Sequence, residues 1–401
     1  MTRHAEERAR PVVMLLGSGE VSRELTLSFQ RLGATVVAVD RYDGAPAHRV
    51  ADRSAVVPMN DPEALGAAVE REHPDYVVVE AGEVAADALI AIAETAEVFP
   101  TPRATRLSLD REGLRRLAAD ELGLPTAPFW FAGSAKELSA VAEHAGFPLA
   151  VTPVAGTPGE GRSVLLRPED VEPAWNRAIA VGHLSTPNRV MAETVVDVDD
   201  EVTLLTVRTT GPTGPAVHFC EPIGHRVAED GTLATWQPHR LNPAALDAAK
   251  SIAARIVNSL GGRGVFAVEL LVRGDEVYFS TVRPRPVDNA FLTVRTQRLS
   301  EFDLHARAIL GLTADTIMIS PGAAEIGYAD GRTPVPAESD VVGVLAEALA
   351  VAESDVLLFD RLDETDGRHR LGAAIATAPD VVVARDRAQR TAVSLRRLWQ
   401  S

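Results

Sequence analysis

Short apolar runs alternate with amphipathic stretches through the first hundred residues. The apolar runs lie at Val12–Gly17, Thr35–Asp40 and Tyr76–Glu80. Near-continuous apolar strands that alternate with helices are typical of a parallel sheet covered on both faces. Ligands of such sheets bind at the carboxyl ends of the strands. The pattern therefore places Gly17–Glu20, Asp40–Tyr42 and Glu80 along one edge.

The pattern changes beyond residue 110. The stretch DREGLRRLAADELG predicts a helix that stops at Gly123, and FPLAVTPV predicts a strand. From Arg189 to Arg285 most segments read as strands, with one helix, ALDAAKSIAARIVNSL, closed by glycine at Gly261. This predicts an antiparallel α+β region distinct from the first. A polar connector, Gly327–Asp340, then leads to a small α/β tail.

Composition narrows the classes of function. The chain has 401 residues, 46% of them hydrophobic, which is enough for two or three domains. A formal net charge of −16 argues against non-specific nucleic-acid binding and against an anionic membrane surface, although local phosphate sites stay open. With Cys220 as its single cysteine the chain forms no intrachain disulfide, which fits a reducing cytoplasm. We therefore expect a cytoplasmic protein with neither nucleic acid nor membrane as a partner.

Two glycine-rich stretches suggest phosphate sites. GSGE at Gly17–Glu20 is a strand-to-helix turn whose backbone amides can bind an anion, but it lacks the third spaced glycine of the dinucleotide fingerprint. A plain tight turn explains it equally well. VTPVAGTPGEG, Val151–Gly161, has the glycines of a phosphate-lining loop. It carries Glu160 and no lysine or arginine, which is unusual for such a loop.

A carboxylate also stands where the pattern predicts core. Glu269 lies in the apolar strand GVFAVELLV, so it needs a metal, an arginine or a shell of hydrogen bonds. Glu269 with Asp288 can hold Mg²⁺, and a structural pair with Arg283 or Arg285 is an equal alternative. The spacing of His218 and Cys220 invites zinc, but without further ligands a packed strand is the better interpretation.

The order of these motifs resembles the ATP-grasp ligases, and among them the formate-dependent phosphoribosylglycinamide formyltransferases. The resemblance spans nearly the whole chain and is carried by GSGE, AVDRYDGAPAHRVADRS, DREGLRRLAA, FCEPIGHR, TWQP, FAVELLV, PRPVDNA and the closing RLG. It implies an α/β and α+β multidomain fold. The domains would be an N-terminal parallel-sheet, Rossmann-like pre-ATP-grasp domain at 1–120, an ATP-grasp domain at 121–326 and a small C-terminal domain at 327–401.

The resemblance also implies the chemistry. ATP, with Mg²⁺ bridging its phosphate oxygens, phosphorylates formate, and the amine of glycinamide ribonucleotide then attacks formyl phosphate. A homodimer is implied as well.

Matching the family's motifs position by position implies three sets of site residues. Those for glycinamide ribonucleotide are Glu20, Glu80, Asp288, Arg361, His369 and Arg370. Those for ATP are Arg111, Thr152, Thr157, Gly159, Gly161, Arg162, Glu193, Val196 and Glu201. Those for the metal are Glu269 and Thr281, with Glu269 and Asp288 as the catalytic pair.

Several of these positions depart from the family's pattern. Thr152 and Glu160 stand where the family has lysines, and Thr281 stands where it has the second metal carboxylate. Gly82 replaces a glutamate, and His369 replaces an arginine. Each lost charge that contacts phosphate or metal is worth a few kcal/mol of transition-state stabilisation. Two alternatives therefore stay open: a phosphoribosyl-binding protein with weak or lost ATP use, and a ligase for another carboxylate or amine.

Overall fold

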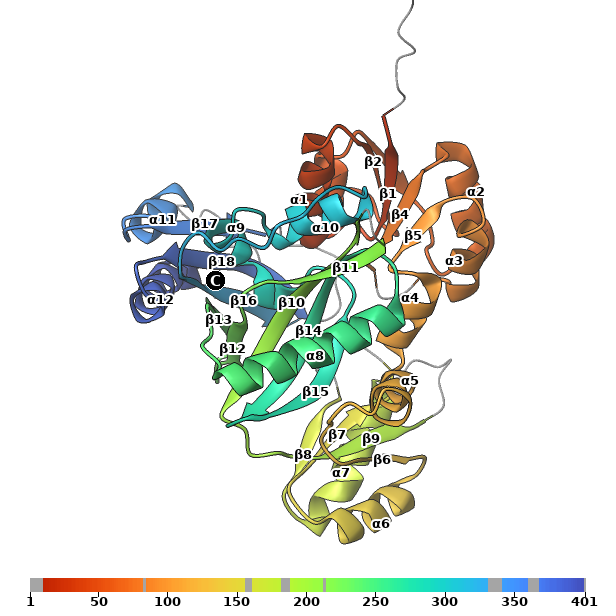
Figure 1. Ribbon diagram of the computed structural model, residues 1–401, viewed down its shortest axis with the longest axis vertical. Coiled ribbons are helices and arrows are strands. Elements are labelled where there is room, and N and C mark those ends of the chain that lie inside the picture. The colour runs from red at the N-terminus through yellow and green to blue at the C-terminus, as the bar shows by residue number, and fades with distance from the viewer. Residues whose placement is uncertain are drawn as a thin grey trace, which may run out of the picture.

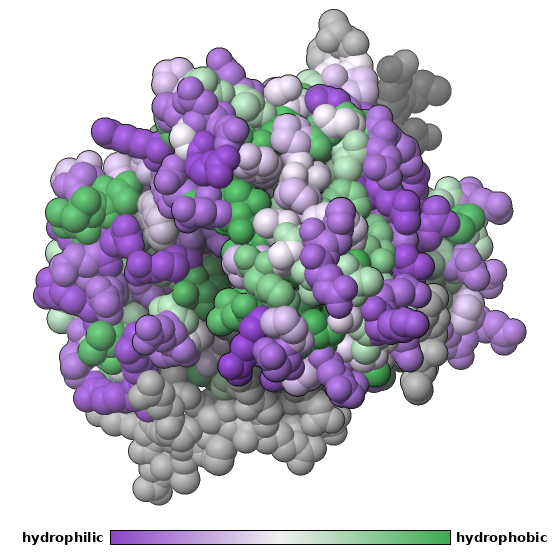
Figure 2. Space-filling model, turned by 90° about the horizontal axis from the view of Figure 1, so that it is seen from below, coloured by the Kyte–Doolittle hydropathy of each residue, from purple (hydrophilic) through white to green (hydrophobic). Residues whose placement is uncertain are grey.

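The computed structural model describes residues 10–81, 84–155, 161–181, 188–211, 214–330, 341–359 and 368–399. Three sheets organise this part of the chain (Figure 1). Seen from below, its surface is largely hydrophilic, with a central hollow bordered by hydrophobic side chains (Figure 2). Within the described residues no helix is long and apolar enough to cross a bilayer.

The N-terminal sheet is parallel, as the alternation predicts. Its strands, in the order β3-β2-β1-β4-β5, are β1 (Val12–Leu16), β2 (Thr35–Asp40), β3 (Arg53–Val56), β4 (Tyr76–Val79) and β5 (Glu97–Phe99). Its helices are α1 (Glu20–Arg31), α2 (Pro62–Glu72) and α3 (Ala86–Ile92). Asp61 caps α2 and accepts hydrogen bonds from two backbone N–H groups, with proline at the first helical position.

Helices cover both faces of this sheet. Leu15 and its neighbours on one face pack in a core with α1 and with α10 (Glu301–Ile309). Met14 and Leu16, on the other face, pack against α2 and α3. The carboxyl ends of the strands are left free of both layers, so polar residues that follow the strands meet there.

The central sheet has nine strands. They are ordered β15-β14-β10-β12-β13-β16-β18-β17, and β11 pairs with β10 beside this path. The strands before residue 300 are β10 (Asp200–Gly211), β11 (Gly214–Phe219), β12 (Ile223–Val227), β13 (Leu233–Gln237), β14 (Gly264–Arg273) and β15 (Glu276–Arg283). Helix α8 (Pro243–Leu260), which ends at Gly261 as expected, covers one face (Figure 1).

The same sheet continues into the C-terminal region. Strand β16 (Gly322–Asp330) pairs with β13 and with β18 (Arg368–Thr377), and β17 (Ser354–Leu358) pairs with β18. Helices α11 (Val341–Ala348) and α12 (Val381–Trp399) complete the region. The expected connector at Gly327 was wrong up to Asp330, because those four residues extend β16 and hydrogen-bond to β18.

A smaller four-stranded sheet lies at the opposite end of the molecule from the N-terminal sheet (Figure 1). Its order is β6-β9-β7-β8, formed by β6 (Phe129–Ala132), β7 (Leu149–Pro153), β8 (Ser163–Leu165) and β9 (Val190–Thr194). Helices α6 (Ala135–Ala145) and α7 (Val171–Ala180) cover one face with their own core. We call this unit the small lobe. Helices α4 (Pro102–Leu109) and α5 (Arg111–Arg116) and a π-helical turn, Leu117–Glu121, lead into it.

Candidate functional site

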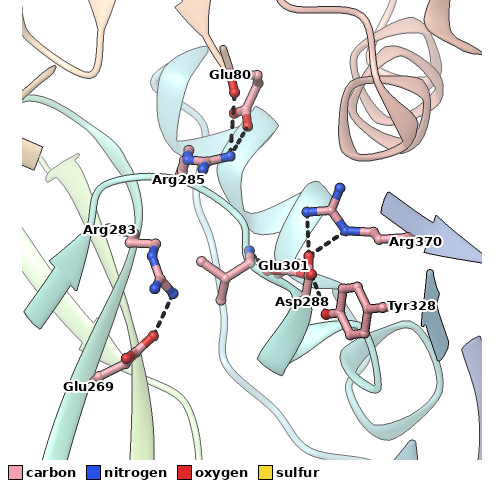
Figure 3. Close-up of polar contacts among 9 residues, drawn as sticks. Glu80, Glu269, Arg283, Arg285, Asp288, Glu301, Tyr328 and Arg370 are labelled. Carbon is pink, nitrogen blue, oxygen red and sulfur yellow. Dashed lines mark hydrogen bonds and ion pairs between the residues drawn. The ribbon is translucent and has the colours of Figure 1, made fainter. Parts of the chain in front are cut away.

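Four of the residues predicted for the ribonucleotide meet at the carboxyl edge of the parallel sheet. Glu20 begins α1, Glu80 follows β4, Asp288 begins a short helical turn after β15, and Arg370 lies on β18. Figure 3 shows Glu80, Asp288 and Arg370 around a common space. Glu20 is close enough to act on the charge of Arg370. The structure thus brings together residues that are up to 350 positions apart in the sequence.

The turn after β1 makes this edge possible. Gly17 has φ +101°, and a Cβ there would lie 2.7 Å from the backbone nitrogen of Ala81. Glycine is therefore required where the chain leaves β1 beside the end of β4. The backbone N–H of Ser18 donates to Asp40 Oδ2 at 2.6 Å, which ties the turn to β2.

Asp288 is held as an anion. Its Oδ1 accepts from Arg370 Nε at 2.7 Å and lies 2.6 Å from Nη2, and the Tyr328 hydroxyl donates to Oδ2 at 2.5 Å (Figure 3). Burial acts to raise the pKa of Asp288, but Arg370 and Tyr328 outweigh it and hold that pKa below its ordinary value. Asp288 therefore positions the Arg370 guanidinium at the site.

Glu80 is the opposite case. Its side chain is 3% exposed, with Arg285 Nη1 3.7 Å from Oε2 and His305 Nε2 4.0 Å from Oε1. Among the described residues, Arg285 contacts the carboxylate as an ion pair, without the geometry of a hydrogen bond. Burial raises the pKa of Glu80 to about 7, against the opposing effects of Arg285 and Arg370. Glu80 can therefore gain or lose a proton near neutral pH.

Two residues beneath Glu80 were missed from the sequence. His305 Nδ1 accepts the N–H of Val265 at 3.0 Å, so the ring proton lies on Nε2, facing Glu80. Burial lowers the pKa of His305 to about 3. Glu301 Oε2 accepts the N–H of Val287 at 2.9 Å, and burial raises its pKa well above the ordinary value. Both lie on a helix that also carries Asp303 and Arg307, so little in the sequence separates them from surface charges.

The second group of predicted residues lies on the central sheet. Leu204 and Val268 pack under α8, so alternation along the strands puts their neighbours on the opposite face. Glu269 there has Thr203 and Thr281 as register partners on β10 and β15. Glu201 is exposed near the start of β10. The sequence left open a metal or an arginine for Glu269, and in the structure Arg283 Nη1 lies 2.5 Å from its Oε1 (Figure 3).

The small lobe is connected to the central sheet through Arg115. Glu193 forms an ion pair with Arg115, which also donates to the carbonyls of Phe279 and Ser280 on β15, at 3.1 Å each. Arg111 Nη1 donates to the carbonyl of Pro153 at 2.7 Å. Thr152 alternates with Val151, which belongs to the lobe's core, so Thr152 and Glu193 share its open face. Arg115 was missed because its helix reads as an exposed amphipathic one.

The remaining predicted residues are less informative. Gly161 has φ +67°, and a Cβ there would lie 2.4 Å from Val181 Cγ2, so glycine is required. Arg162 is exposed, and Val196 lies between β9 and β10. Positions outside the described residues are Gly82, Thr157, Gly159, Glu160 and Arg361.

His369 does not join Arg370. Its register partner Ala329 packs toward α11 and α12, whereas Tyr328, the partner of Arg370, packs toward the core that contains Phe291. His369 therefore lies on the other face of β18. The zinc hypothesis gains no support either: no group of three His, Cys, Asp or Glu side chains is arranged to hold a metal in the described part of the chain.

Comparison with known proteins decides the family. The ribonucleotide synthetase pre-ATP-grasp domain matches residues 12–108 and the ATP-grasp domain matches 117–302. A formate-dependent phosphoribosylglycinamide formyltransferase of Corynebacterium glutamicum (strain R) is 48% identical over 388 residues, which are 96% of this chain and 94% of that protein. The chain belongs to the formate-dependent phosphoribosylglycinamide formyltransferase family.

Further relatives agree. The formate-dependent phosphoribosylglycinamide formyltransferase of Rhodococcus jostii is 49% identical over 387 residues, covering 95% of this chain and 94% of that protein. The solved structure of glycinamide-RNase-transformylase T from Mycobacterium tuberculosis shares 53% identity, with a TM-score of 0.81 and coverage of 96% of this chain and 99% of that one. The resemblance inferred from the motifs is thereby confirmed.

A two-carboxylate metal site does not fit the residues of this formyltransferase family member. Glu269 is paired with Arg283, and its register partner Thr281 offers a neutral hydroxyl. Mg²⁺ prefers carboxylate and phosphate oxygens. Asp288, the other carboxylate considered for Mg²⁺, is bonded to Arg370 and Tyr328, so Glu269 is the single carboxylate of the Glu269–Thr281 pair.

Proposed function

We propose that this protein is a formate-dependent phosphoribosylglycinamide formyltransferase of purine biosynthesis, which spends ATP to activate formate and formylates glycinamide ribonucleotide. The observation that carries the proposal is the convergence of Glu20, Glu80, Asp288 and Arg370 at one sheet edge. Relatives named for this activity match over nearly the whole chain. The ribonucleotide would lie at this edge, with ATP between the central sheet and the small lobe.

The ribonucleotide end supplies both a fixed cation and a proton acceptor. Arg370, oriented by Asp288, suits an anionic or hydroxyl-bearing part of the ribonucleotide. Glu80 has no hydrogen-bond donor among the described residues, so an N–H of the substrate would provide the one it lacks. A carboxylate with a pKa of about 7 is suited to take a proton from the amine as the amide bond forms.

The ATP end rests on the residues predicted for it that the structure describes. Arg111 and Glu193 both take part in bonds that join α5 to the small lobe, whose open face carries Thr152, and Glu201 lies on the central sheet. Mg²⁺ would arrive with the nucleotide and neutralise phosphate charge, and Glu269, whose Oε1 is bonded to Arg283, would offer it Oε2. The homodimer and the cytoplasmic location stay predictions; light scattering of the purified protein tests the first.

The direct test is turnover. Purified protein is incubated with ATP, MgCl₂, formate and glycinamide ribonucleotide, and ADP and the formylated ribonucleotide are measured by mass spectrometry. We expect both products, each dependent on formate. Glu80→Gln should abolish the formylated product, whereas the exposed Glu70→Gln on α2 should not change it. Absence of formate-dependent ADP from the wild-type protein would refute the proposal.

A further inference from the structure

Arg283 shares one face of the central sheet with the residues predicted for the metal. Thr281 and Arg283 are two apart on β15, so their side chains point to the same side. Glu269 lies opposite Thr281 in the strand register. The Arg283 guanidinium reaches Glu269 at 2.5 Å, and both side chains are more than 70% buried. An arginine is therefore built into the space beside the single metal carboxylate.

The charges around this pair oppose a second divalent ion. The charge of Arg283 acts on Arg111, so a second guanidinium lies within electrostatic range of this pair. His225 on β12 lies within electrostatic range of Glu269, Glu201 and Arg283. A second divalent ion would have to displace Arg283 from Glu269 and then sit near two guanidinium groups, with the exposed Glu201 as the further carboxylate on this face. Coulomb repulsion at these short distances is strong when the site is partly buried.

The chemistry of the side chains at this place also favours a guanidinium over a second divalent ion. The Thr281 hydroxyl brings no charge, and Mg²⁺ in nucleotide sites is held by carboxylates together with phosphate oxygens. A guanidinium carries a permanent charge and five N–H donors in a planar fork that matches phosphate oxygens. Thr152, on the open face of the small lobe, brings no positive charge to this end, and Arg283 supplies one.

We propose that Arg283 is a phosphate-binding residue that takes the place of one protein-bound divalent cation, with Glu269 holding its guanidinium in position. The inference rests on the proposed function for the identity of the nucleotide. It makes nucleotide binding by this protein less dependent on divalent metal than a site with two carboxylates would be.

The first experiment measures metal without nucleotide. Mn²⁺ binding to the full chain is followed by electron paramagnetic resonance for the wild type and for Thr281→Glu combined with Arg283→Ser. The wild type should bind weakly, and the double variant should gain at least about tenfold in Mn²⁺ affinity. Arg273→Ser, which removes an exposed arginine from the same hairpin, is the control and should match the wild type. Wild-type Mn²⁺ binding as tight as that of the double variant would overturn the inference.

The second experiment measures ADP binding by calorimetry, once with MgCl₂ and once with EDTA. Wild-type affinity should change less than about tenfold between the two conditions, whereas Arg283→Ser should lose at least about tenfold in EDTA. Arg283→Lys, which keeps the charge and loses the fork, should fall between them. An unchanged affinity of Arg283→Ser in EDTA would contradict the proposal. If ADP binds in neither condition, the proposed ATP use fails, and the Mn²⁺ measurement still decides on Arg283.

Discussion

At the scale of single residues, the two ends of the ribonucleotide site are held in opposite ways. Asp288 has its charge satisfied by Arg370 and Tyr328, while Glu80 is buried without a hydrogen bond from any described residue. A buried polar group without a partner is costly, and such groups concentrate where a ligand completes the site. Glu80 is thus destabilising for the fold and available to the substrate.

This state of Glu80 predicts a specific dependence of stability on pH. Its folded-state pKa of about 7 exceeds its ordinary value of 4.5, so between these pH values the folded protein binds more protons than the unfolded chain. The associated stabilisation is complete below pH 4.5 and is lost as the pH rises through 7. Relative to Glu80→Gln, the wild type should lose about 2.5 kcal/mol of unfolding free energy between pH 5 and pH 8. Urea denaturation at several pH values measures this.

Only the slope with pH is diagnostic, because replacing Glu80 also removes the charge near Arg285 and can shift stability at every pH. Glu70→Gln on the surface should leave the wild-type slope unchanged. Parallel curves for the wild type and Glu80→Gln would mean that Glu80 titrates in its ordinary range.

A second prediction concerns Tyr328. Its hydroxyl donates to a charged, largely buried carboxylate, so Tyr328→Phe should cost about 1–2 kcal/mol of unfolding free energy and weaken ribonucleotide binding. The control is Tyr278→Phe, which removes a hydroxyl bond to Glu276 on the exposed hairpin. The control should cost a few tenths of a kcal/mol at most. Equal losses of unfolding free energy in the two variants would show that the hydrogen bond to Asp288 stabilises the fold no more than one on the surface.

Some of these residues were accessible from the sequence and some were not. Glu20 and Glu80 follow directly from strand ends in a parallel sheet, because that topology fixes where the ends meet. The pairing of Asp288 with Arg370 came from family resemblance, since nothing local indicates a contact across 82 positions. Arg115 and His305 were missed because each lies on a helix whose pattern is explained by packing alone.

At the scale of elements, helix α10 connects α1 with the buried residues next to Glu80. Ser300 caps the helix in a reciprocal capping box with Asp303, and Asp303 also accepts a hydrogen bond from Ser28 of α1 at 3.0 Å. The helix carries Glu301 and His305 beneath Glu80. Its N-terminal cap therefore helps to fix the floor of the ribonucleotide site.

Removing this cap should affect binding as well as stability. Ser300→Ala should cost about 1 kcal/mol of unfolding free energy and raise the ribonucleotide Kd, because α10 is less firmly placed. Ser134→Ala removes the equivalent cap of α6 in the small lobe, where the hydroxyl accepts from Glu137 N. It should cost a similar amount and leave the Kd for the ribonucleotide unchanged. Calorimetry and urea denaturation separate the two effects, and an equal change in Kd would remove the link to α10.

The ends of helices were easier to predict from the sequence than the ends of strands. The ends of α2, α8 and α10 follow from local caps that act within one turn, at Asp61, Gly261 and Ser300. The extension of β16 to Asp330 depends on its pairing with residues of β18 that lie 38 to 45 positions later in the sequence. The glycine and polar residues of GYAD conceal a strand that only a distant partner stabilises.

At the scale of the whole molecule, the central sheet crosses the boundary that the sequence placed at residue 327. One core combines Leu205 of β10 with Ile375 of β18, and the rings of Phe291 and Phe359 lie 5.4 Å apart within it. The small lobe has a separate core under α6 and α7. We propose that the C-terminal region unfolds together with the central sheet, and that the small lobe is the more independent unit.

Two variants, each of which buries a charge, test whether the C-terminal region unfolds together with the central sheet. Ala374→Asp places a carboxylate at a fully buried position of β18 between β16 and β17, and Ala142→Asp does the same in α6, where the alanine is 2% exposed. An unpaired buried charge costs about 3–5 kcal/mol. Hydrogen exchange followed by mass spectrometry should show faster exchange in β10 and β14 as well as in β18 for Ala374→Asp. For Ala142→Asp the faster exchange should stay within residues 129–194. If the effect of Ala374→Asp stops at residue 341, the C-terminal region is an independent domain, and Arg370 reaches Asp288 across an interface between domains instead of from within one sheet.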